Sequence, residues 1–407
     1  MKKLIFLGGS DIQVPAIKYA KSLGYYIITI DYLPENPGHI LSDKYYNIST
    51  IDKDKVLEVA EKENVDGIIS YASDPSALTA SYVSEKLGLP GVNYESCKIL
   101  SNKHLFRKFL ANHNFPFPKF KNILSENDIH DFLKEHKKCI IKPVDSSGSK
   151  GISIISLKNY SSEFYKNSLN FSRSKKVIVE EFIEKKGKQL CGDVLIIDGK
   201  LIFSSFGNVH FDDKCNGLTP CSITLPSEQS ENIIKKINSF ISDLFEKLNI
   251  NYGCFNIDLI LDKDDKIYIL DIGARNGGNL FTELIKEHTG IDIVRIIIDS
   301  SCDKNFKISD CFNNKYILDN HKKLPVAHYV LHTNKGGLFK EIEFKESIIN
   351  NIFYKNIKIK TSENINKFNG SNNRIGLCLL KFKDKDEMLD KIINFEKHIN
   401  INFYEKR

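Results

Sequence analysis

The chain has 407 residues, of which 41% are hydrophobic and 11% aromatic, and this length indicates about two or three ordinary globular domains. Its 58 basic and 52 acidic residues are interspersed, so the charge pattern contains no basic block of the kind that binds nucleic acid. The uncharged apolar runs are far too short to cross a membrane. The expected partners are therefore small molecules, not nucleic acid or a membrane, with a homodimer as an open alternative.

The cysteines and the first residues indicate a compartment. The nine cysteines are an odd number, form no C-x-x-C pair and often lie in apolar runs, which predicts reduced thiols in the cytoplasm. The chain begins MKKLIFLGG, with two lysines and a four-residue apolar run. Because no small-residue cleavage site follows, we expect this segment to be a first β-strand and not a signal peptide.

Residues 1–95 alternate between strand-like and helix-like patterns, which predicts a parallel sheet. The expected strands are 3–8, 26–32 and 66–71, and the expected helices are 15–24, 53–65 and 77–88. The first strand ends in GGSDIQ, which lacks the full G-x-G-x-x-G of a dinucleotide site, so NAD binding is disfavoured. Ser10, Asp11 and Asp74 follow strand ends and are candidates to contact a small polar substrate, with helix capping as the alternative for each.

Residues 96–300 form a larger predicted unit, and 301–407 a smaller one of α+β type. The larger unit is expected to contain an amphipathic helix over 95–113, an extended link at 116–120, a strand from 177, and hairpins over 189–208 and 255–275. The first hairpin turns at Asp198-Gly199, a strong turn signal. The segment 206–226 has no clear periodicity and is expected to cover the acceptor site, with His210 as a base, a substrate contact or a surface histidine. The smaller unit is expected to have strands at 336–344 and 375–382 and a helix over 385–399.

The stretch IIKPVDSSGSKGISII at 140–155 places a flexible loop between two apolar runs. Small residues and glycines let backbone N–H groups approach a ligand closely, and such a turn forms a concave set of donors for phosphate oxygens. Lys142 ends the first run, where its ammonium would add charge to the same anion. The alternative is a serine-rich hairpin turn with two solvated lysines.

Two aspartates interrupt the apolar strands of the second hairpin, in FNIDLIL and IYILDIG. If residues 262–265 form the turn, Asn256 lies opposite Asp271, and Asp258 is its diagonal neighbour on the same face, about 7–8 Å away. Two such carboxylates suit Mg²⁺, which prefers oxygen ligands together with substrate phosphates. The alternative is that one of them faces solvent. Arg275 follows in a glycine-containing turn, where a guanidinium can bind phosphate or carboxylate in bidentate fashion.

Together these residues describe a nucleoside triphosphate site with metal, and in their order along the chain they resemble the ATP-grasp superfamily of ligases. The resemblance covers essentially the whole chain and implies α/β and α+β architecture in three parts. These are a Rossmann-like pre-ATP-grasp domain (1–95), a two-lobed ATP-grasp domain (96–300) and a small α+β C-terminal domain (301–407).

The resemblance also implies roles for individual residues. Phosphate contacts fall to Lys103, Lys142, Ser146, Ser147, Gly148, Lys150 and Gly151. Glu180 matches the residue that meets the adenine amino group, Phe182 and Ile183 the hinge that holds the base, and Gln189 the ribose position. Asp258 and Asp271 match the Mg²⁺ ligands, with Mn²⁺ as an alternative metal. Lys142 and Arg275 are the residues expected to act in catalysis, Arg275 near the γ-phosphate and the acyl phosphate.

Two positions depart from the family pattern. Gln189 stands where the family often has glutamate, and the usual E-x-N-x-R reads D-I-G-A-R here. Gly273 therefore occupies the metal-ligand asparagine position, and a second Mg²⁺ would need Asn276 or water. The variant G-A-R-N-G-G is most similar to the L-amino-acid ligase branch.

The resemblance implies an ADP-forming ligase that joins a carboxylate to an amine through an acyl phosphate. One alternative is an ATP-grasp carboxylase-type enzyme that activates bicarbonate. A nicotinamide oxidoreductase and a non-catalytic nucleotide-binding protein are two further readings, which NAD binding and ATP turnover would test.

Overall fold

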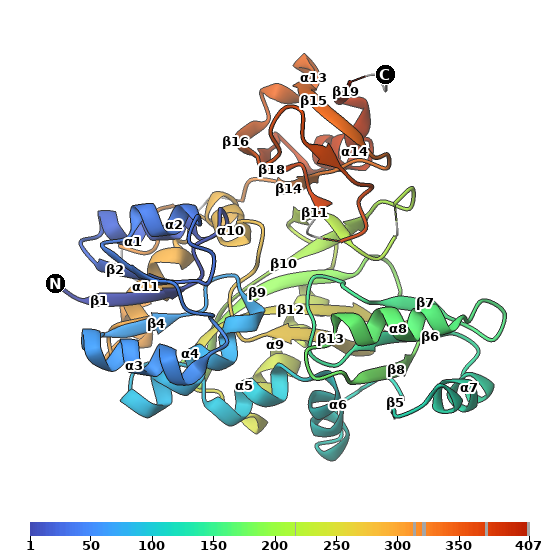
Figure 1. Cartoon of the computed structure of the whole chain (residues 1–407), viewed down its shortest axis with the longest axis horizontal. Coiled ribbons are helices and arrows are strands. Elements are labelled where there is room, and N and C mark those ends of the chain that lie inside the picture. The colour runs from blue at the N-terminus through green and yellow to red at the C-terminus, as the bar shows by residue number, and fades with distance from the viewer. Residues whose placement is uncertain (216, 312–314, 320–322, 371–372, 405–407) are drawn as a thin grey trace.

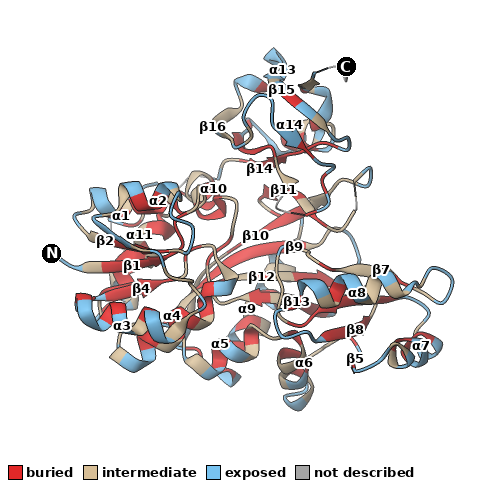
Figure 2. Ribbon diagram, in the orientation of Figure 1, coloured by how far each residue is buried: buried red, intermediate tan, exposed pale blue. Residues whose placement is uncertain are grey.

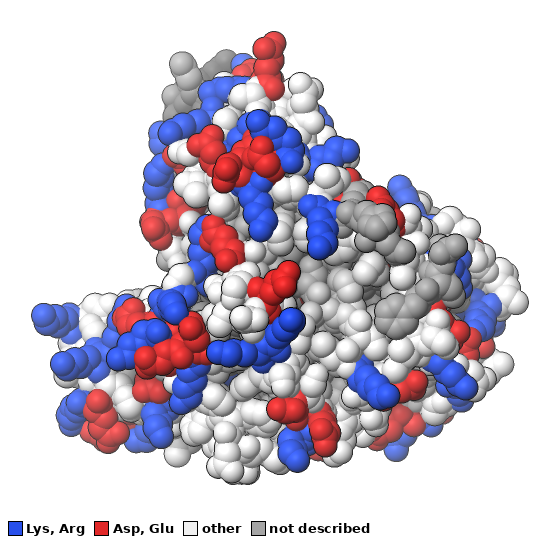
Figure 3. All heavy atoms as spheres, turned by 180° about the vertical axis from the view of Figure 1, so that it is seen from behind, with Lys and Arg blue, Asp and Glu red and all other residues white. Residues whose placement is uncertain are grey.

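Four β-sheets carry the fold in the computed structural model of the chain, which describes residues 1–215, 217–311, 315–319, 323–370 and 373–404 (Figure 1). Burial follows the strands of these sheets, while the outer faces of the surrounding helices are exposed (Figure 2). On the face seen from behind, basic and acidic side chains intermingle (Figure 3). Each helix in the described part of the chain is too short or too polar to cross a membrane.

The N-terminal sheet is parallel, as the sequence predicts, with strand order β3-β2-β1-β4. Its strands are β1 (Lys3–Leu7), β2 (Tyr26–Ile30), β3 (Lys44–Tyr46) and β4 (Gly67–Ile69). The helices that alternate with them are α1 (Val14–Ser22), α2 (Pro37–Leu41), α3 (Lys53–Glu63) and α4 (Asp74–Leu87). The pair α2 and β3 is additional to the elements expected from the sequence.

The two faces of this sheet are covered by different parts of the chain. Helices α3 and α4 pack on one face through side chains such as Val56 and Val83. On the other face, α1 packs beside α11 (Ile293–Ser301), which contributes Val294 and Ile298 (Figure 1). A helix from residues 293–301 thus completes the core of the N-terminal sheet, although it lies some 200 residues further along the chain.

The predicted helix over 95–113 is in fact two helices, α5 (Tyr94–Leu100) and α6 (Lys103–Asn112). Asn102 separates them, because its side-chain oxygen accepts a hydrogen bond from the backbone N–H of Leu105 at 3.1 Å and so caps α6. Lys103 therefore becomes the first residue of α6, and its backbone N–H donates to Val144 O at 2.8 Å.

A four-stranded antiparallel sheet forms one lobe, with strand order β5-β8-β6-β7. Its strands are β5 (Phe120–Ile123), β6 (Cys139–Pro143), β7 (Ser153–Ile155) and β8 (Val177–Glu181). Helices α7 (Glu126–Glu135) and α8 (Ser162–Phe171) pack on it around a shared apolar core. The serine- and glycine-rich loop joins β6 to β7.

The largest sheet is antiparallel, with strand order β13-β12-β9-β10-β11-β14-β18-β16. Its strands are β9 (Leu190–Ile197), β10 (Lys200–Phe211), β11 (Pro220–Leu225), β12 (Gly253–Leu261), β13 (Ile267–Gly273), β14 (Val326–Leu331), β16 (Ile352–Ile357) and β18 (Gly376–Lys381). The predicted turn at Asp198-Gly199 is confirmed, since both residues have positive φ (51° and 70°). The segment 206–226, whose sequence has no clear periodicity, is mostly strand, because β10 and β11 fill most of it and pair with each other.

Two helices pack on the large sheet, and a small sheet follows near the C-terminus. Helix α9 (Glu231–Lys247) packs on β12 and β13, and α10 (Phe281–Thr289) packs near β11 and β14. The small sheet has the order β17-β15-β19, formed by β15 (Gly337–Phe344), β17 (Asn364–Ile365) and β19 (Ile399–Phe403). Helices α13 (Glu346–Ile349) and α14 (Lys385–Ile393) pack in this part, whereas the short α12 (Ile308–Cys311) packs through Cys311 with Leu195 and Ile197 of β9. The predicted helix over 385–399 ends at 393, and a 3₁₀ turn at Phe395–Lys397 leads into β19.

Candidate active site

Asp258 on β12 lies directly opposite Asp271 on β13. The expected register, with Asn256 opposite Asp271, is wrong, because Asn256 pairs with Gly273. Two local features shift it. The turn is one residue longer than expected, so Leu261 pairs with Ile267, and Leu270 is an extra residue between the pairs Asp258–Asp271 and Leu259–Ile269. The bulge brings the two carboxylates closer than the diagonal arrangement would.

The opposed carboxylates form a half-buried patch of like charge. Burial and then the charge of Asp271 raise the pKa of Asp258 to about 6. Gln189 Nε2 donates to Asp258 Oδ1 at 3.3 Å, and Lys103 Nζ lies 3.0 Å from Asp271 Oδ2. Two facing carboxylates fit a hard divalent cation, which would relieve their repulsion and which prefers oxygen ligands.

Lys103 joins this patch to the loop after β6. Its side chain is buried, and Nζ donates to Ser146 O at 2.9 Å as well as pairing with Asp271. The break between α5 and α6 therefore fixes an ammonium between the carboxylate pair and the start of the loop.

The loop over 146–151 is held at both ends. Asp145 accepts hydrogen bonds from Ser172 Oγ and Ser174 N, each at 2.8 Å, and Gly151 O accepts one from Ser168 Oγ at 2.6 Å. Gly151 has φ of 70°, and a Cβ there would lie 3.0 Å from Pro143 Cγ, so a glycine is required at this end. Ser146, Ser147, Gly148 and Lys150 lie between the two anchors, where phosphate contact stays a prediction.

Lys142, Glu180 and Arg107 form a buried cluster of two cations and one carboxylate. Lys142 Nζ lies 2.7 Å from Glu180 Oε2, and Arg107 Nε donates to Glu180 Oε1 at 3.0 Å. Burial lowers the pKa of Lys142 to about 8. Burial alone would raise the pKa of Glu180, but the two cations outweigh it and hold that pKa below its usual range.

Arg107 is a site residue that the sequence analysis did not identify. It is fully buried on α6, one turn after Lys103, and its Nη2 also donates to Leu270 O at 2.7 Å. It thus ties the four-stranded lobe to the bulged residue of β13. Arg107 follows Lys103 by four residues, so both side chains lie on the same face of the helix, and this spacing could have identified Arg107 from the sequence.

The expected base-binding residues follow the same strand. Phe182 and Ile183 come directly after β8 and are half-buried, and the Lys138 ammonium lies 3.6 Å from the centroid of the Phe182 ring. The Glu180 carboxylate is already taken by Arg107 and Lys142. Its expected contact with an adenine amino group therefore stays a prediction.

Arg275 binds Asp74 across the boundary between the large sheet and the N-terminal unit. Nε donates to Oδ1 at 2.8 Å and Nη2 donates to Oδ2 at 2.7 Å, which is a bidentate pair. Asp74 is the first residue of α4, and the guanidinium outweighs burial to hold the pKa of Asp74 below its usual range. The sequence identified both residues but not their pairing.

This pair explains the glycine at 273. A Cβ on Gly273 would lie 2.8 Å from Asp74 Oδ1 and 3.0 Å from Arg275 Cζ, so a side chain there would disrupt the pair. Asn276 is buried, and its Oδ1 accepts a hydrogen bond from Ala72 N at 3.1 Å. Because the Asn276 side-chain oxygen already has this backbone partner, the structure does not support the expectation that Asn276 binds a second metal ion.

Three other candidates have internal partners. Ser10 Oγ donates to Gln13 Oε1 at 2.5 Å, and Asp11 Oδ2 accepts from Arg374 Nη2 at 2.7 Å. His210 lies on β10 with Nε2 3.0 Å from Thr224 Oγ1, so it is not a surface-loop histidine. Burial lowers the pKa of His210 to about 4, which keeps the ring neutral at pH 7.

Asp193 on β9 is a second residue that the sequence analysis did not identify. It is fully buried; both carboxylate oxygens accept from Gly277 N at 2.9 Å, and Oδ1 also accepts from Asn256 Nδ2 at 2.9 Å. Burial raises the pKa of Asp193 to about 6. It anchors the turn that presents Arg275. An aspartate inside the apolar run LCGDVLII was the available signal, the same one that marked Asp258 and Asp271.

The chain was compared with known families and structures. Residues 100–279 match the family model described as the ATP-grasp domain. The carbamoyl phosphate synthase large chain of Pseudothermotoga lettingae is 26% identical over 301 residues, and the match covers 70% of this chain but only 26% of that protein. The chain thus spans about a quarter of the length of that curated relative.

Two solved structures share the fold over the whole chain. The L-amino acid ligase from Bacillus licheniformis has a TM-score of 0.81 at 18% identity, covering 100% of this chain and 99% of that one. The phosphoribosylglycinamide synthetase from Anaerococcus prevotii has a TM-score of 0.77 at 22% identity, covering 99% of this chain and 100% of that one.

Proposed function

We propose that the chain, whose residues 100–279 match the ATP-grasp domain family, is an ATP-dependent ligase that joins a carboxylate to an amine. The observation that carries the proposal is the facing pair of Asp258 and Asp271, with Lys103 Nζ 3.0 Å from Asp271 and 2.9 Å from the carbonyl that opens the loop. Two acidic oxygen ligands beside a cation and a donor-rich loop suit a metal-bound triphosphate.

The proposed nucleotide contacts divide among three elements. Lys103, Lys142 and the loop residues Ser146, Ser147, Gly148, Lys150 and Gly151 would bind the phosphates. Phe182 and Ile183 would hold the base, with Glu180 at its amino group, and Gln189 would bind the ribose. Because Gln189 already donates to Asp258, it would link the sugar to the metal ligands.

Asp258 and Asp271 would hold Mg²⁺, or Mn²⁺ in its place. When bound, the metal supplies positive charge for the phosphate oxygens. The raised pKa of Asp258 supports this assignment, because burial and the charge of Asp271 both destabilise its carboxylate and a bound cation would stabilise it.

In the proposed reaction, the substrate carboxylate attacks the γ-phosphate of ATP, and an amine then attacks the resulting acyl phosphate, so that ADP and phosphate leave and an amide forms. Lys142 and Arg275 would stabilise the negative charge that develops on the transferred group. Arg275 must first exchange Asp74 for the incoming anion. The loop over 146–151 would exclude water from the acyl phosphate.

The test is phosphate release from ATP and Mg²⁺ across a matrix of amino acids and small acids, followed by mass spectrometry of the product. An amide formed together with ADP supports the proposal. AMP would indicate adenylate chemistry and overturn it, and ADP formed with bicarbonate alone would favour the carboxylase alternative. The architecture shared with the L-amino acid ligase makes amino acids the first acids to try.

We also propose that the protein works in the cytoplasm on small molecules. The nine cysteines are all free thiols, and most are buried. A reducing compartment keeps such thiols unoxidised. Fractionation of cells from the source organism tests this proposal.

A further inference from the structure

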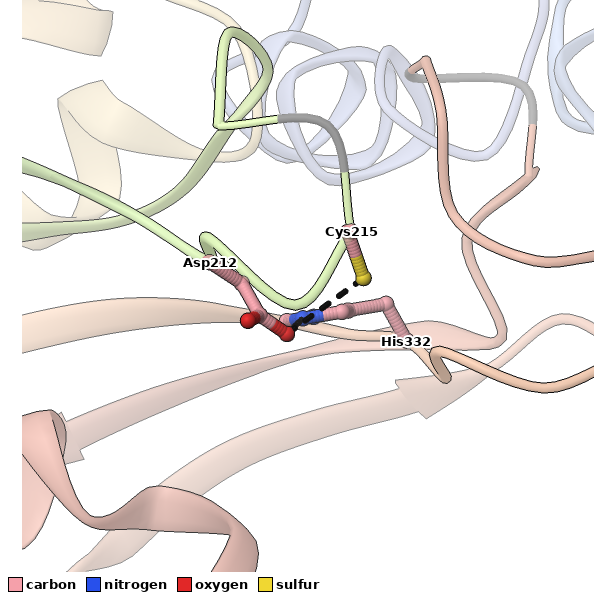
Figure 4. Close-up of side chains that lie close together, drawn as sticks. All are labelled: Asp212, Cys215 and His332. Atoms are coloured by element: carbon pink, nitrogen blue, oxygen red, sulfur yellow. Dashed lines mark hydrogen bonds and ion pairs between the residues drawn. The ribbon is translucent and has the colours of Figure 1, made fainter.

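A cluster of Asp212, Cys215 and His332 lies outside the proposed nucleotide site. Asp212 and Cys215 lie in the turn after β10, and His332 directly follows β14 (Figure 4). His332 Nε2 lies 3.0 Å from Asp212 Oδ2, and Cys215 Sγ lies 3.3 Å from the same oxygen. One ligand atom from each residue lies within 4.8 Å of the other two.

The imidazole of His332 is held in one orientation. The ring is buried, stacks with Tyr329 at a centroid distance of 5.6 Å and lies 4.5 Å from the Phe368 ring. Its Nδ1 lies 2.7 Å from Val330 O, a carbonyl that only accepts, so Nδ1 carries a hydrogen. Nε2 is left to face Asp212 Oδ2 at 3.0 Å, and this contact is satisfied either by a second proton on the ring or by a metal ion that both atoms bind.

We propose that Asp212, Cys215 and His332 bind one divalent transition-metal ion of the Zn²⁺ type. Sulfur, imidazole nitrogen and carboxylate oxygen are the ligands that Zn²⁺ takes in proteins. Tetrahedral bonds of about 2.0–2.3 Å place ligand atoms roughly 3.3–3.7 Å apart. The two separations from Asp212 Oδ2, 3.0 Å and 3.3 Å, are near this range. A histidine whose Nδ1–H is fixed by a backbone carbonyl, with Nε2 toward the ligands, is the usual arrangement at such sites.

The Cys215 thiol faces two oxygen acceptors, Asp212 Oδ2 at 3.3 Å and Thr333 O at 3.9 Å. Such oxygen-rich surroundings suit a bound cation. Asp212 and Cys215 are only half-buried, which leaves a solvent-facing side where water would complete four ligands. The ion would tie the β10–β11 turn to the end of β14.

The two proposed metal sites differ in the kinds of ligand atom that they offer. Asp258 and Asp271 offer oxygen alone, which suits Mg²⁺, whereas the Asp212–Cys215–His332 cluster includes a sulfur that Mg²⁺ does not prefer. The inference therefore does not depend on the proposed ligase activity.

The experiment uses the full chain, stripped with a chelator and dialysed against Zn²⁺ or Co²⁺. Metal content is measured by mass spectrometry, and Co²⁺ is followed by its visible d–d bands and its thiolate charge-transfer band. We expect one tightly held ion per chain. Cys215→Ser should abolish the charge-transfer band, and His332→Gln should weaken metal affinity by more than the about 10–100-fold typical of losing an outer-shell partner.

The matched controls are Cys221→Ser, which removes a nearby buried thiol on β11 that donates to His210 O, and Asp271→Asn at the other proposed metal site. Both should keep the Co²⁺ spectrum of the wild type. Circular dichroism checks that each variant is folded. Wild-type protein without stoichiometric Zn²⁺ or Co²⁺, or a charge-transfer band that survives in Cys215→Ser, overturns the proposal without reference to any variant's activity.

Discussion

Two charged clusters lie near the start of the loop after β6, and they have opposite charge compositions. Arg107, Glu180 and Lys142 are all buried and joined by direct ion pairs, so two cations share one carboxylate. Asp258, Asp271 and Lys103 have the reverse composition, two carboxylates with one ammonium, and both carboxylates are half-buried. The first cluster has an excess of positive charge and the second an excess of negative charge.

The difference shows what each cluster lacks. An anion would complete the charge balance of the Arg107–Glu180–Lys142 cluster, and a cation would complete that of the Asp258–Asp271–Lys103 cluster. A metal-bound triphosphate supplies both at once. Without a nucleotide, Glu180 is the counter-ion of two buried cations, whereas the Asp258–Asp271 pair is half-buried, so the two clusters should respond differently to substitution.

The largest effect is expected on stability, from Glu180→Gln. The variant leaves Arg107 and Lys142 buried without a counter-charge, which should lower the free energy of unfolding by about 3–5 kcal/mol. Urea denaturation measures it. The control is Glu184→Gln, whose side chain is 81% exposed and which should leave the unfolding free energy nearly unchanged. Equal stability of both variants would show that the buried cluster does not support the fold.

The next effect is expected on turnover, from Asp271→Asn. This variant removes a metal ligand where negative charge develops, and it should reduce ATP-dependent phosphate release by at least about 100-fold. Thermal unfolding should remain cooperative. Asp264→Asn, in the exposed turn of the same hairpin, should keep wild-type turnover. Wild-type rates in Asp271→Asn would contradict the metal assignment.

A smaller effect is expected on the pH dependence of stability, through Asp258. Its pKa of about 6 in the fold exceeds an unfolded value of about 3.9, so the folded state holds the extra proton between these values. Stability of the metal-free protein should therefore fall as pH rises through this window. Asp258→Asn removes that loss and should gain about 2 kcal/mol relative to wild type between pH 4 and pH 7.

The measurement is chemical denaturation of both proteins across pH in the presence of a chelator. Added Mg²⁺ should restore the stability of the wild type at pH 7 but not change Asp258→Asn to the same extent. Parallel pH profiles for the two proteins would show that Asp258 carries no raised pKa.

The smallest effect is expected from Lys150→Ala. Lys150 lies on the loop, where backbone donors are expected to carry the phosphate contact, so the change in KM for ATP should stay below about fivefold. Lys142→Ala removes a buried ammonium and should weaken the binding of ATP much more than Lys150→Ala does. Similar large losses in both variants would mean that side chains, not the backbone, hold the phosphates.

Sequence reasoning identified residues that break a local pattern. Asp258 and Asp271 interrupt apolar strands, and Lys142 precedes a loop of serines and glycines, so each is visible within a few positions of the chain. The alternation of strands and helices over 1–95 is equally local, and the parallel sheet is confirmed.

The remaining features depend on contacts between distant segments. The bulge at Leu270 becomes visible only when β12 and β13 are aligned, and its carbonyl is satisfied by Arg107 from α6. The pairing of Arg275 with Asp74 joins positions 201 residues apart. Helix α11 packs on the N-terminal sheet. The predicted division of the chain, with one unit over 1–95 and another over 96–300, did not include this contact. Such pairings follow from tertiary packing, not from local propensity.

In the bidentate pair between Arg275 and Asp74, the Asp74 carboxylate occupies the guanidinium and therefore competes with any anion that would bind there. Any anion that approaches the guanidinium displaces a carboxylate already in place, so binding is an exchange and its net free energy is the difference between two similar interactions. A weakly basic anion gains little from that exchange, whereas one with several charged oxygens gains more. We therefore expect the internal carboxylate to disfavour the binding of ordinary solution anions at Arg275.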